Sequence, residues 1–212
     1  MLCCRPVPDD VTMEALGIRL DDEAAAALRV DCIPVARRIH KAGRRIVGLL
    51  PASTDIGVMA VGVQLGLALV EVANTTVAYV DANVRWPAIS QIAVGTRPND
   101  DESMFATRWL RGQLALLVPP HVGEAGAGVP QLARVIQHSI ELFSHVVVDL
   151  TGFKKLGEHL AAIEMMDGVV VVARAGHTTE DDLLRLSHEL PANLHLGVLL
   201  AHATLPPPAS DQ

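Results

Sequence analysis

The sequence contains few aromatic residues and few cysteines. Phenylalanine, tryptophan and tyrosine together make up 3% of the 212 residues, and Tyr79 is the single tyrosine. The cysteines, Cys3, Cys4 and Cys32, do not have the spacing of metal ligands, and the nine histidines form no tight cluster. We therefore expect a reduced, cytoplasmic chain without a metal centre built from Cys or His.

The sequence also lacks a long uninterrupted apolar run and an excess of positive charge. The longest run, residues 56–70, is interrupted by Gln64 and is shorter than the roughly 18 to 20 residues of a membrane span, so it predicts a buried core helix. No charged segment followed by an apolar stretch and a cleavage site opens the chain, so no secretory signal is expected. The net charge of −7 argues against nonspecific nucleic-acid binding.

Half of the residues are hydrophobic, which suits one compact domain with a large core. Short β-rich or apolar runs alternate with helical patterns along the chain. This order predicts an α/β fold, a doubly wound and mainly parallel sheet with helices on both faces. The predicted strands are residues 45–50, 75–81, 113–118, 145–149, 168–174 and 194–200. Between residues 82 and 111 the pattern is weak, with a short helix predicted around Met104 to Leu110.

Helix signals divide the chain further. Asp21 or Asp22 can cap a helix from Glu23, with a break or kink at Pro34. The other predicted helices are residues 58–70, 130–144, 156–166 and 179–190, the last with a capping-box pattern at Thr179. We interpret residues 1–35 as an arm and first helix, residues 36–203 as a P-loop NTPase-like domain, and residues 204–212 as a flexible tail.

The stretch from Arg45 to Ala68 has the order of a phosphate-binding loop: a strand, a tight loop and an apolar helix. The pattern G-x-x-x-x-G-K-[ST] requires a lysine and a hydroxyl after its last glycine, but Val58 and Met59 follow Gly57 here. Asp55 adds a carboxylate where a phosphate would lie. The plain alternative is a buried β–turn–helix without a ligand.

Two predicted strands end in an acid, Asp81 and Asp149. Ligands of doubly wound sheets bind beyond the carboxyl ends of the strands, so we expect both acids and the Asp55 loop to converge there. Simple strand termination is the alternative.

Several segments together resemble the cytoplasmic domain of the bacterial tyrosine kinases of polysaccharide export (BY-kinases), within the MinD/ParA group of P-loop ATPases. Residues 77–87 resemble the second Walker motif, in which Asp81, Arg85 and Pro87 match and Asn83 replaces the second acid. Residues 145–152 resemble the Walker B strand, with Asp149 in the magnesium-facing place. Gly152 stands where the family prefers proline, and residues 171–179 resemble a strand-to-helix turn of these kinases.

The resemblance implies where a nucleotide site would be. The degenerate site comprises Asp55, Gly57, Val58, Met59, Asp81 and Arg85, with magnesium at Asp81 and Asp149 only if a nucleotide binds. We predict no catalytic residue and no cofactor. Kinases of this family phosphorylate a tyrosine-rich tail, which the composition excludes here.

The leading hypothesis is therefore a catalytically silent regulator or scaffold of exopolysaccharide synthesis or export. The resemblance implies an inner-membrane co-polymerase or export component as partner, which would recruit this cytoplasmic chain. One alternative is a MinD/ParA-like ATPase that uses Lys154 or Lys155 as its cation, with ATP and magnesium as cofactors. Another is a positioning or pilus-assembly adaptor.

Oligomeric state is a separate question. The ring-assembly motif of the family, Glu-x-x-Arg-x-x-Arg, is incomplete, because Glu23 is followed by Ala26 and then Arg29. We predict that the chain self-associates or docks on a partner through its arm and first helix, residues 2–35. The incomplete motif argues against a ring, whereas a homodimer remains open.

Overall fold

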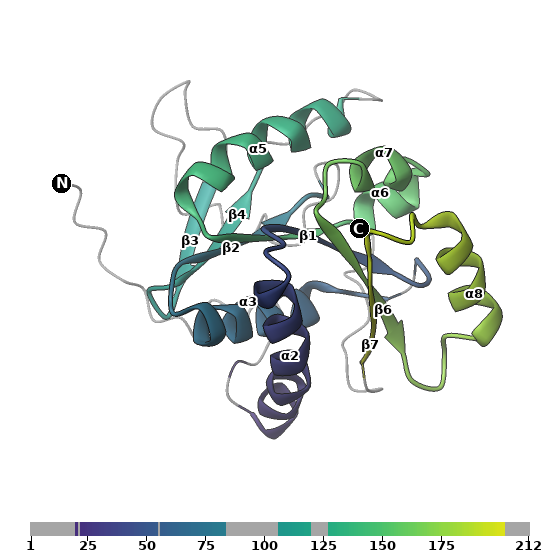
Figure 1. The fold of residues 1–212 in the computed structure, drawn as a ribbon, viewed down its shortest axis with the longest axis horizontal. Helices are drawn as coiled ribbons and strands as arrows, with labels where there is room; N and C mark the ends of the chain where they lie inside the picture. Colours follow the sequence, from purple (N-terminus) through teal and green to yellow (C-terminus); the bar gives the residue numbers. More distant parts are fainter. Residues whose placement is uncertain (1–19, 21, 55, 84–105, 120–126, 202–212) are drawn as a thin grey trace, which may run out of the picture.

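The structure, a computed structural model, describes residues 20, 22–54, 56–83, 106–119 and 127–201 (Figure 1). The segment 1–19 of the predicted arm, the tail 204–212, and the predicted site residues Asp55 and Arg85 lie outside these ranges.

A seven-stranded sheet forms the centre of the described residues, in the order β3-β4-β2-β5-β1-β6-β7. β3 pairs antiparallel with β4, and all other neighbours pair parallel. The prediction of a mainly parallel, doubly wound sheet is therefore confirmed. The strands are β1 Ile46–Pro51, β2 Val77–Asp81, β3 Ala106–Leu110, β4 Leu114–Val118, β5 His145–Asp149, β6 Gly168–Arg174 and β7 His195–Ala201.

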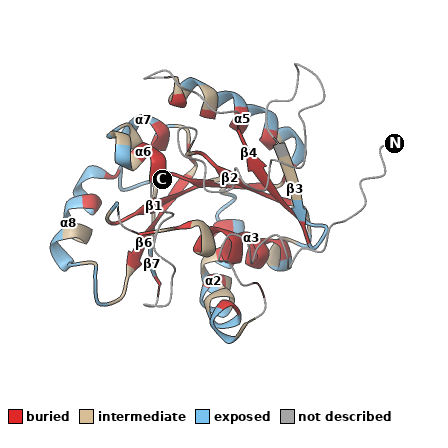
Figure 2. Cartoon of the chain, turned by 180° about the vertical axis from the view of Figure 1, so that it is seen from behind, coloured by how far each residue is buried: buried red, intermediate tan, exposed pale blue. Residues whose placement is uncertain are grey.

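Helices cover both faces of this sheet (Figure 1). They are α2 Glu23–Lys41, α3 Met59–Ala73, α5 Gly128–Leu142, α6 Thr151–Leu156, α7 His159–Ile163 and α8 Glu180–Glu189. α2 and α3 lie on one face and α5, α6 and α7 on the other, with α8 beside α7 (Figure 1). Figure 2 shows the central strands buried and the outward sides of the helices exposed. No helix in the described ranges is long and apolar enough to cross a membrane.

The predicted short helix around Met104 to Leu110 is wrong, because residues 106–110 form the edge strand β3. Arg111 and Gly112, with φ of +48° and +70°, are the central residues of the turn in the three-residue connection 111–113, and Gln113 N donates to Leu110 O at 3.2 Å. Positive φ at both central residues is the geometry of a hairpin turn that matches the twist of its strands. The hairpin thus makes β3 the antiparallel edge.

Of the break or kink predicted near Pro34, the break is wrong, because α2 is one helix of 19 residues that crosses the boundary between residues 35 and 36. Pro34 and Val30 are both exposed, so water can bind the Val30 carbonyl that proline leaves unpaired. The Asp22 side chain accepts from Ala25 N at 2.7 Å and caps the helix as predicted. The buried side of α2 belongs to the same core as the sheet through Cys32, Ala36 and Ile39.

α3 packs against both α2 and the sheet, and residues 61–70 are all buried. Two glycines allow it to approach the strands closely. A Cβ on Gly62 would lie 2.2 Å from the Tyr79 ring, and one on Gly66 would lie 2.8 Å from Leu114. The apolar run of the sequence is therefore a core helix, as its length and composition predict.

The C-terminal half follows the sequence pattern with one difference. The helix predicted over residues 156–166 is two short helices, α6 and α7, separated by Gly157 with φ of +73°. The capping box of α8 is confirmed: Thr179 Oγ1 accepts from Asp182 N at 3.2 Å, and Thr179 N donates to Asp182 at 3.2 Å.

Candidate functional site

The β1–α3 connection has the predicted strand–loop–helix order at the carboxyl end of β1. Ala52 N continues the sheet by donating to Val172 O at 2.8 Å, and Ile56 N donates to Ser53 O at 3.3 Å in the turn. Ile56 and Val58 are buried, so apolar side chains hold this loop against the core.

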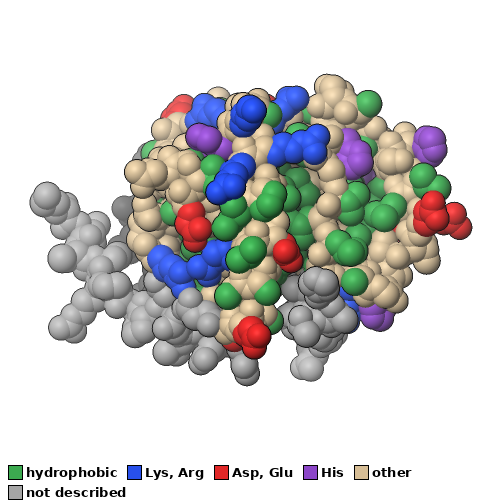
Figure 3. Space-filling view, turned by 60° about the horizontal axis from the view of Figure 1, so that its bottom comes forward, with side chains coloured by type: hydrophobic (Ala, Val, Ile, Leu, Met, Phe, Trp, Pro, Cys, Tyr) green, Lys and Arg blue, Asp and Glu red, His purple; other side chains and the backbone are tan. Residues whose placement is uncertain are grey.

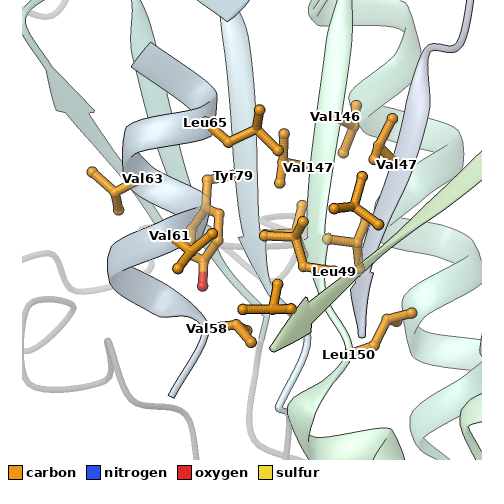
Figure 4. Close-up of a cluster of buried hydrophobic side chains, with 14 of the residues drawn as sticks. Val47, Leu49, Val58, Val61, Val63, Leu65, Tyr79, Val146, Val147 and Leu150 are labelled. Carbon is orange, nitrogen blue, oxygen red and sulfur yellow. The ribbon is translucent and has the colours of Figure 1, made fainter. Parts of the chain in front are cut away.

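Val58, in the place of the P-loop lysine, is 1% exposed and belongs to the hydrophobic core. Figure 4 shows it at the start of α3, in the cluster that also includes Leu49 and Leu150. Met59 is partly buried and packs against the same core. Val58 also begins the helix without a side-chain cap. The start of α3 therefore offers neither a cation nor a hydroxyl to a phosphate or a magnesium ion.

Asp81 and Asp149 come together at the carboxyl edge of the sheet, as predicted. They are register partners on the neighbouring parallel strands β2 and β5, and are 1% and 5% exposed. Asp55 and Arg85, expected beside them, lie outside the described residues.

The Asp149 carboxylate already accepts hydrogen bonds on both oxygens. Tyr79 Oη donates to Oδ2 at 2.9 Å, and Thr151 N donates to Oδ1 at 2.8 Å. Burial raises the pKa of Asp149 above its usual range, and the hydrogen bonds from Thr151 and Tyr79 oppose that rise. The pKa of Tyr79 is raised well above its ordinary value, first by burial and then by Asp149 and Asp81.

Sequence reasoning did not assign Tyr79 to this site, although one signal was present. A tyrosine in an otherwise apolar, buried strand needs a hydrogen-bond partner for its hydroxyl. An acid at the end of the neighbouring strand, two residues beyond the residue that pairs with the tyrosine, can accept that hydrogen bond. The hydroxyl is buried and hydrogen-bonded to a carboxylate, so it is not presented for phosphorylation in this conformation.

Asn83 follows Asp81, Gly152 follows Asp149, and these two residues lie in contact with each other. Asp81 Oδ1 accepts from Asn83 N at 3.1 Å. A Cβ on Gly152 would lie 2.6 Å from Asn83 Oδ1 and 2.9 Å from Asn83 Cα. A proline, the residue the resemblance implies at position 152, would meet the same atoms, so the two departures from the family pattern lie in contact.

Lys154 and Lys155, the candidate replacement cations, lie in the last turn of α6. The pKa of Lys154 is lowered, first by burial, while its charged neighbours Glu189, Arg185 and Asp182 all belong to α8. The Lys154 ammonium group therefore lies near α8. Lys155 is exposed to solvent. Within the described ranges, no three His, Cys, Asp or Glu side chains gather as metal ligands.

Solved structures share this arrangement of strands and helices. The BceF tyrosine kinase domain matches with a TM-score of 0.63 at 17% identity, covering 93% of this chain and 88% of that one. The kinase domain of the Escherichia coli tyrosine kinase ETK matches with a TM-score of 0.65 at 13% identity, covering 100% and 87%. The VpsO kinase domain gives 0.62 at 14% identity, covering 85% and 96%.

The chain has the fold of these tyrosine kinase domains. The predicted BY-kinase-like, P-loop NTPase-like architecture is thereby confirmed at the level of fold. No family model matches the sequence, and no curated protein matches it.

P-loop folds bind a nucleotide beyond the carboxyl ends of the parallel strands, and in this chain the β1–α3 loop, Asp81 and Asp149 lie at that edge of the sheet. The described residues fit Mg-ATP poorly there. Val58 is apolar and buried, Met59 carries no hydroxyl, and the Asp149 oxygens bind donors of the chain itself.

Proposed function

We propose that the chain is a catalytically silent regulator or scaffold of exopolysaccharide synthesis or export, with the fold of a BY-kinase domain. It acts in the cytoplasm beside an inner-membrane co-polymerase or export component, which recruits it. The role rests on the fold and on the motif resemblance over residues 36–203.

The single observation that carries the proposal is the burial of Val58. A phosphate-binding lysine needs a flexible stem that reaches over the loop, whereas the Val58 side chain is buried in the hydrophobic core at the start of α3 (Figure 4). Val58 therefore contributes to core packing. It does not supply the positive charge that phosphoryl transfer requires at this position.

The Tyr79–Asp149 hydrogen bond supports the same proposal. A magnesium-facing carboxylate must keep an oxygen accessible to the ion or its waters. Here Asp149 is buried, and its two oxygens accept from Tyr79 on β2 and from Thr151 N at the start of α6.

A complementation experiment tests the proposal with Asp81→Asn. Deleting the gene in the bacterium that carries it should lower exopolysaccharide output, and the Asp81→Asn chain should restore it as fully as the unmodified chain. The amide keeps the oxygen that accepts from Asn83 N and removes the charge a magnesium site would need.

Immunoblots should confirm equal amounts of both chains. Failure of Asp81→Asn to restore output at equal protein level would contradict catalytic silence. Unchanged output after deletion, with altered motility or secretion, would favour the adaptor alternative.

A further inference from the structure

Positive charge is concentrated at one end of α2, in a chain whose net charge is −7. Residues 32–54 contain no acid, whereas Arg37, Arg38, Lys41, Arg44 and Arg45 supply five of the chain's 17 lysines and arginines. The cations near the helix C-terminus also suit the helix dipole, but that effect extends only over the last turn.

Two of these five cations, Arg44 and Arg45, are used inside the fold. The Arg45 guanidinium donates to the carbonyls of Ile140 and Phe143 at the end of α5, the latter at 3.2 Å. Arg44 Nη2 donates to Asn193 O at 3.3 Å. Their role is therefore structural.

Arg37, Arg38 and Lys41 are different, because all three are exposed and form no salt bridge with any described residue. They project from the final turns of α2 and leave their charges available to an external anion.

Apolar side chains lie next to these cations. Val30, Pro34, Arg38 and Lys41 recur at helical spacing and share one side of α2. Val30 is 63% exposed, and Val198 and Leu200 on the edge strand β7 are 45% and 53% exposed.

A groove of about 270 Å³ separates α2 from β7. Its lining is mostly apolar, with Pro34, Val35, Leu196 and Val198 among its residues and Arg38 as its cation. Figure 3 shows hydrophobic side chains and a group of Lys and Arg side chains together on this side of the molecule. We call it the α2–β7 face: Val30, Pro34, Arg37, Arg38, Lys41, Val198 and Leu200.

We propose that the α2–β7 face docks directly on an anionic lipid bilayer. Cations beside exposed aliphatic side chains match a surface in which anionic headgroups cover hydrocarbon. A nucleic acid would use the cations but would leave Val30, Val198 and Leu200 exposed to water. The acidic remainder of the chain would face away from the membrane, which fixes one orientation.

This docking goes beyond the proposed function, because it requires no protein partner and does not involve the nucleotide edge of the sheet. Val30 and Lys41 lie on α2, whereas Asp81 and Asp149 end β2 and β5. Failure of either proposal therefore leaves the other standing.

Vesicle co-sedimentation of the full chain tests the inference. Vesicles with about 30% phosphatidylglycerol should bind the protein, and vesicles of phosphatidylcholine alone should bind it far less. The triple variant Arg37→Gln, Arg38→Gln, Lys41→Gln should lower the partition coefficient about 100-fold, since each surface cation contributes roughly fivefold.

The matched control removes three exposed cations elsewhere, in Arg134→Gln, Lys155→Gln, Arg185→Gln. It has the same net charge as the test variant and should bind as the unmodified chain does. The apolar component is tested with Val30→Ser, Leu200→Ser, which should weaken the binding that remains at about 0.5 M salt, where charge attraction is screened. Circular dichroism should show that all variants are folded.

Three outcomes would overturn the proposal: no binding to anionic vesicles, equal losses in the test and control triples, or tighter binding to a short DNA duplex or an acidic peptide than to the vesicles.

Discussion

At the residue scale, the Tyr79–Asp149 pair determines what the carboxyl edge of the sheet can do. Both groups are buried, and the phenol donates to the carboxylate at 2.9 Å. Because the pKa of Asp149 is raised, the Asp149 carboxyl group binds its proton more tightly in the folded chain than in the unfolded chain. The free energy of unfolding should therefore fall as the pH rises from the ordinary value of 3.8 towards the raised one.

We expect Tyr79→Phe to lower the free energy of unfolding by about 1 to 3 kcal/mol at neutral pH, the cost of losing a partner for a buried polar group. The hydroxyl stabilises the charged carboxylate, so its removal raises the pKa of Asp149 further. The loss should therefore be smaller below pH 3.8, where Asp149 is protonated in both states. Urea unfolding of both chains between neutral pH and pH values below 3.8 measures this loss of stability.

A double-mutant cycle provides the control. In an Asp149→Asn background, Tyr79→Phe should show no dependence on pH between these limits. If Tyr79→Phe lowers the free energy of unfolding equally at every pH, with or without Asp149, the Tyr79 hydroxyl does not act through this carboxylate.

At the scale of elements, α8 depends on its cap. Thr179 Oγ1 accepts from Asp182 N, and the hydrogen bonds from Thr179 are the main cause of the lowered pKa of Asp182. Thr179→Ala should cost about 1 kcal/mol in urea unfolding. It should also raise the pKa of Asp182 towards its usual value in an NMR titration.

Ser187→Ala, on the exposed side of the same helix, is the matched control and should change the free energy of unfolding by less than about 0.5 kcal/mol. If Thr179→Ala behaves like Ser187→Ala in both measurements, the cap does not stabilise α8.

Sequence patterns predicted the elements best where one physical cause was dominant. The strands β2, β4 and β5 were recognisable because they are buried along their full length and consist mostly of apolar residues. β3 was missed because an Arg111-Gly112 turn lacks the common Asn-Gly signal. The continuity of α2 was missed because it depends on the exposure of Val30 and Pro34, a property of packing.

The candidate site was predictable in part for a similar reason. Asp81 and Asp149 could be placed at one edge because parallel strands bring their carboxyl ends together. The Tyr79–Asp149 bond depends on the register of β2 against β5, and the burial of Val58 depends on how α3 sits on the sheet. Neither is encoded in local spacing.

At the scale of the whole molecule, the chain has the fold of kinase domains, and we propose that it lacks the chemistry of a nucleotide site. Relative to the P-loop pattern, Val58 stands in the place of the lysine, Met59 stands in the place of the hydroxyl, and Asp55 adds a carboxylate to the loop. If each change costs about 1.5 to 3 kcal/mol, the total is roughly 4 to 9 kcal/mol, enough to weaken a micromolar site past millimolar. The proposed function therefore predicts that this chain does not bind Mg-ATP.

Isothermal titration calorimetry of the full chain with ATP and magnesium tests that claim most directly, with the kinase domain of Escherichia coli ETK, which shares the fold, as positive control. The account predicts no measurable heat of binding at concentrations where the control saturates. A dissociation constant below about 50 μM would contradict the silent-scaffold proposal and would make the chain an ATPase candidate.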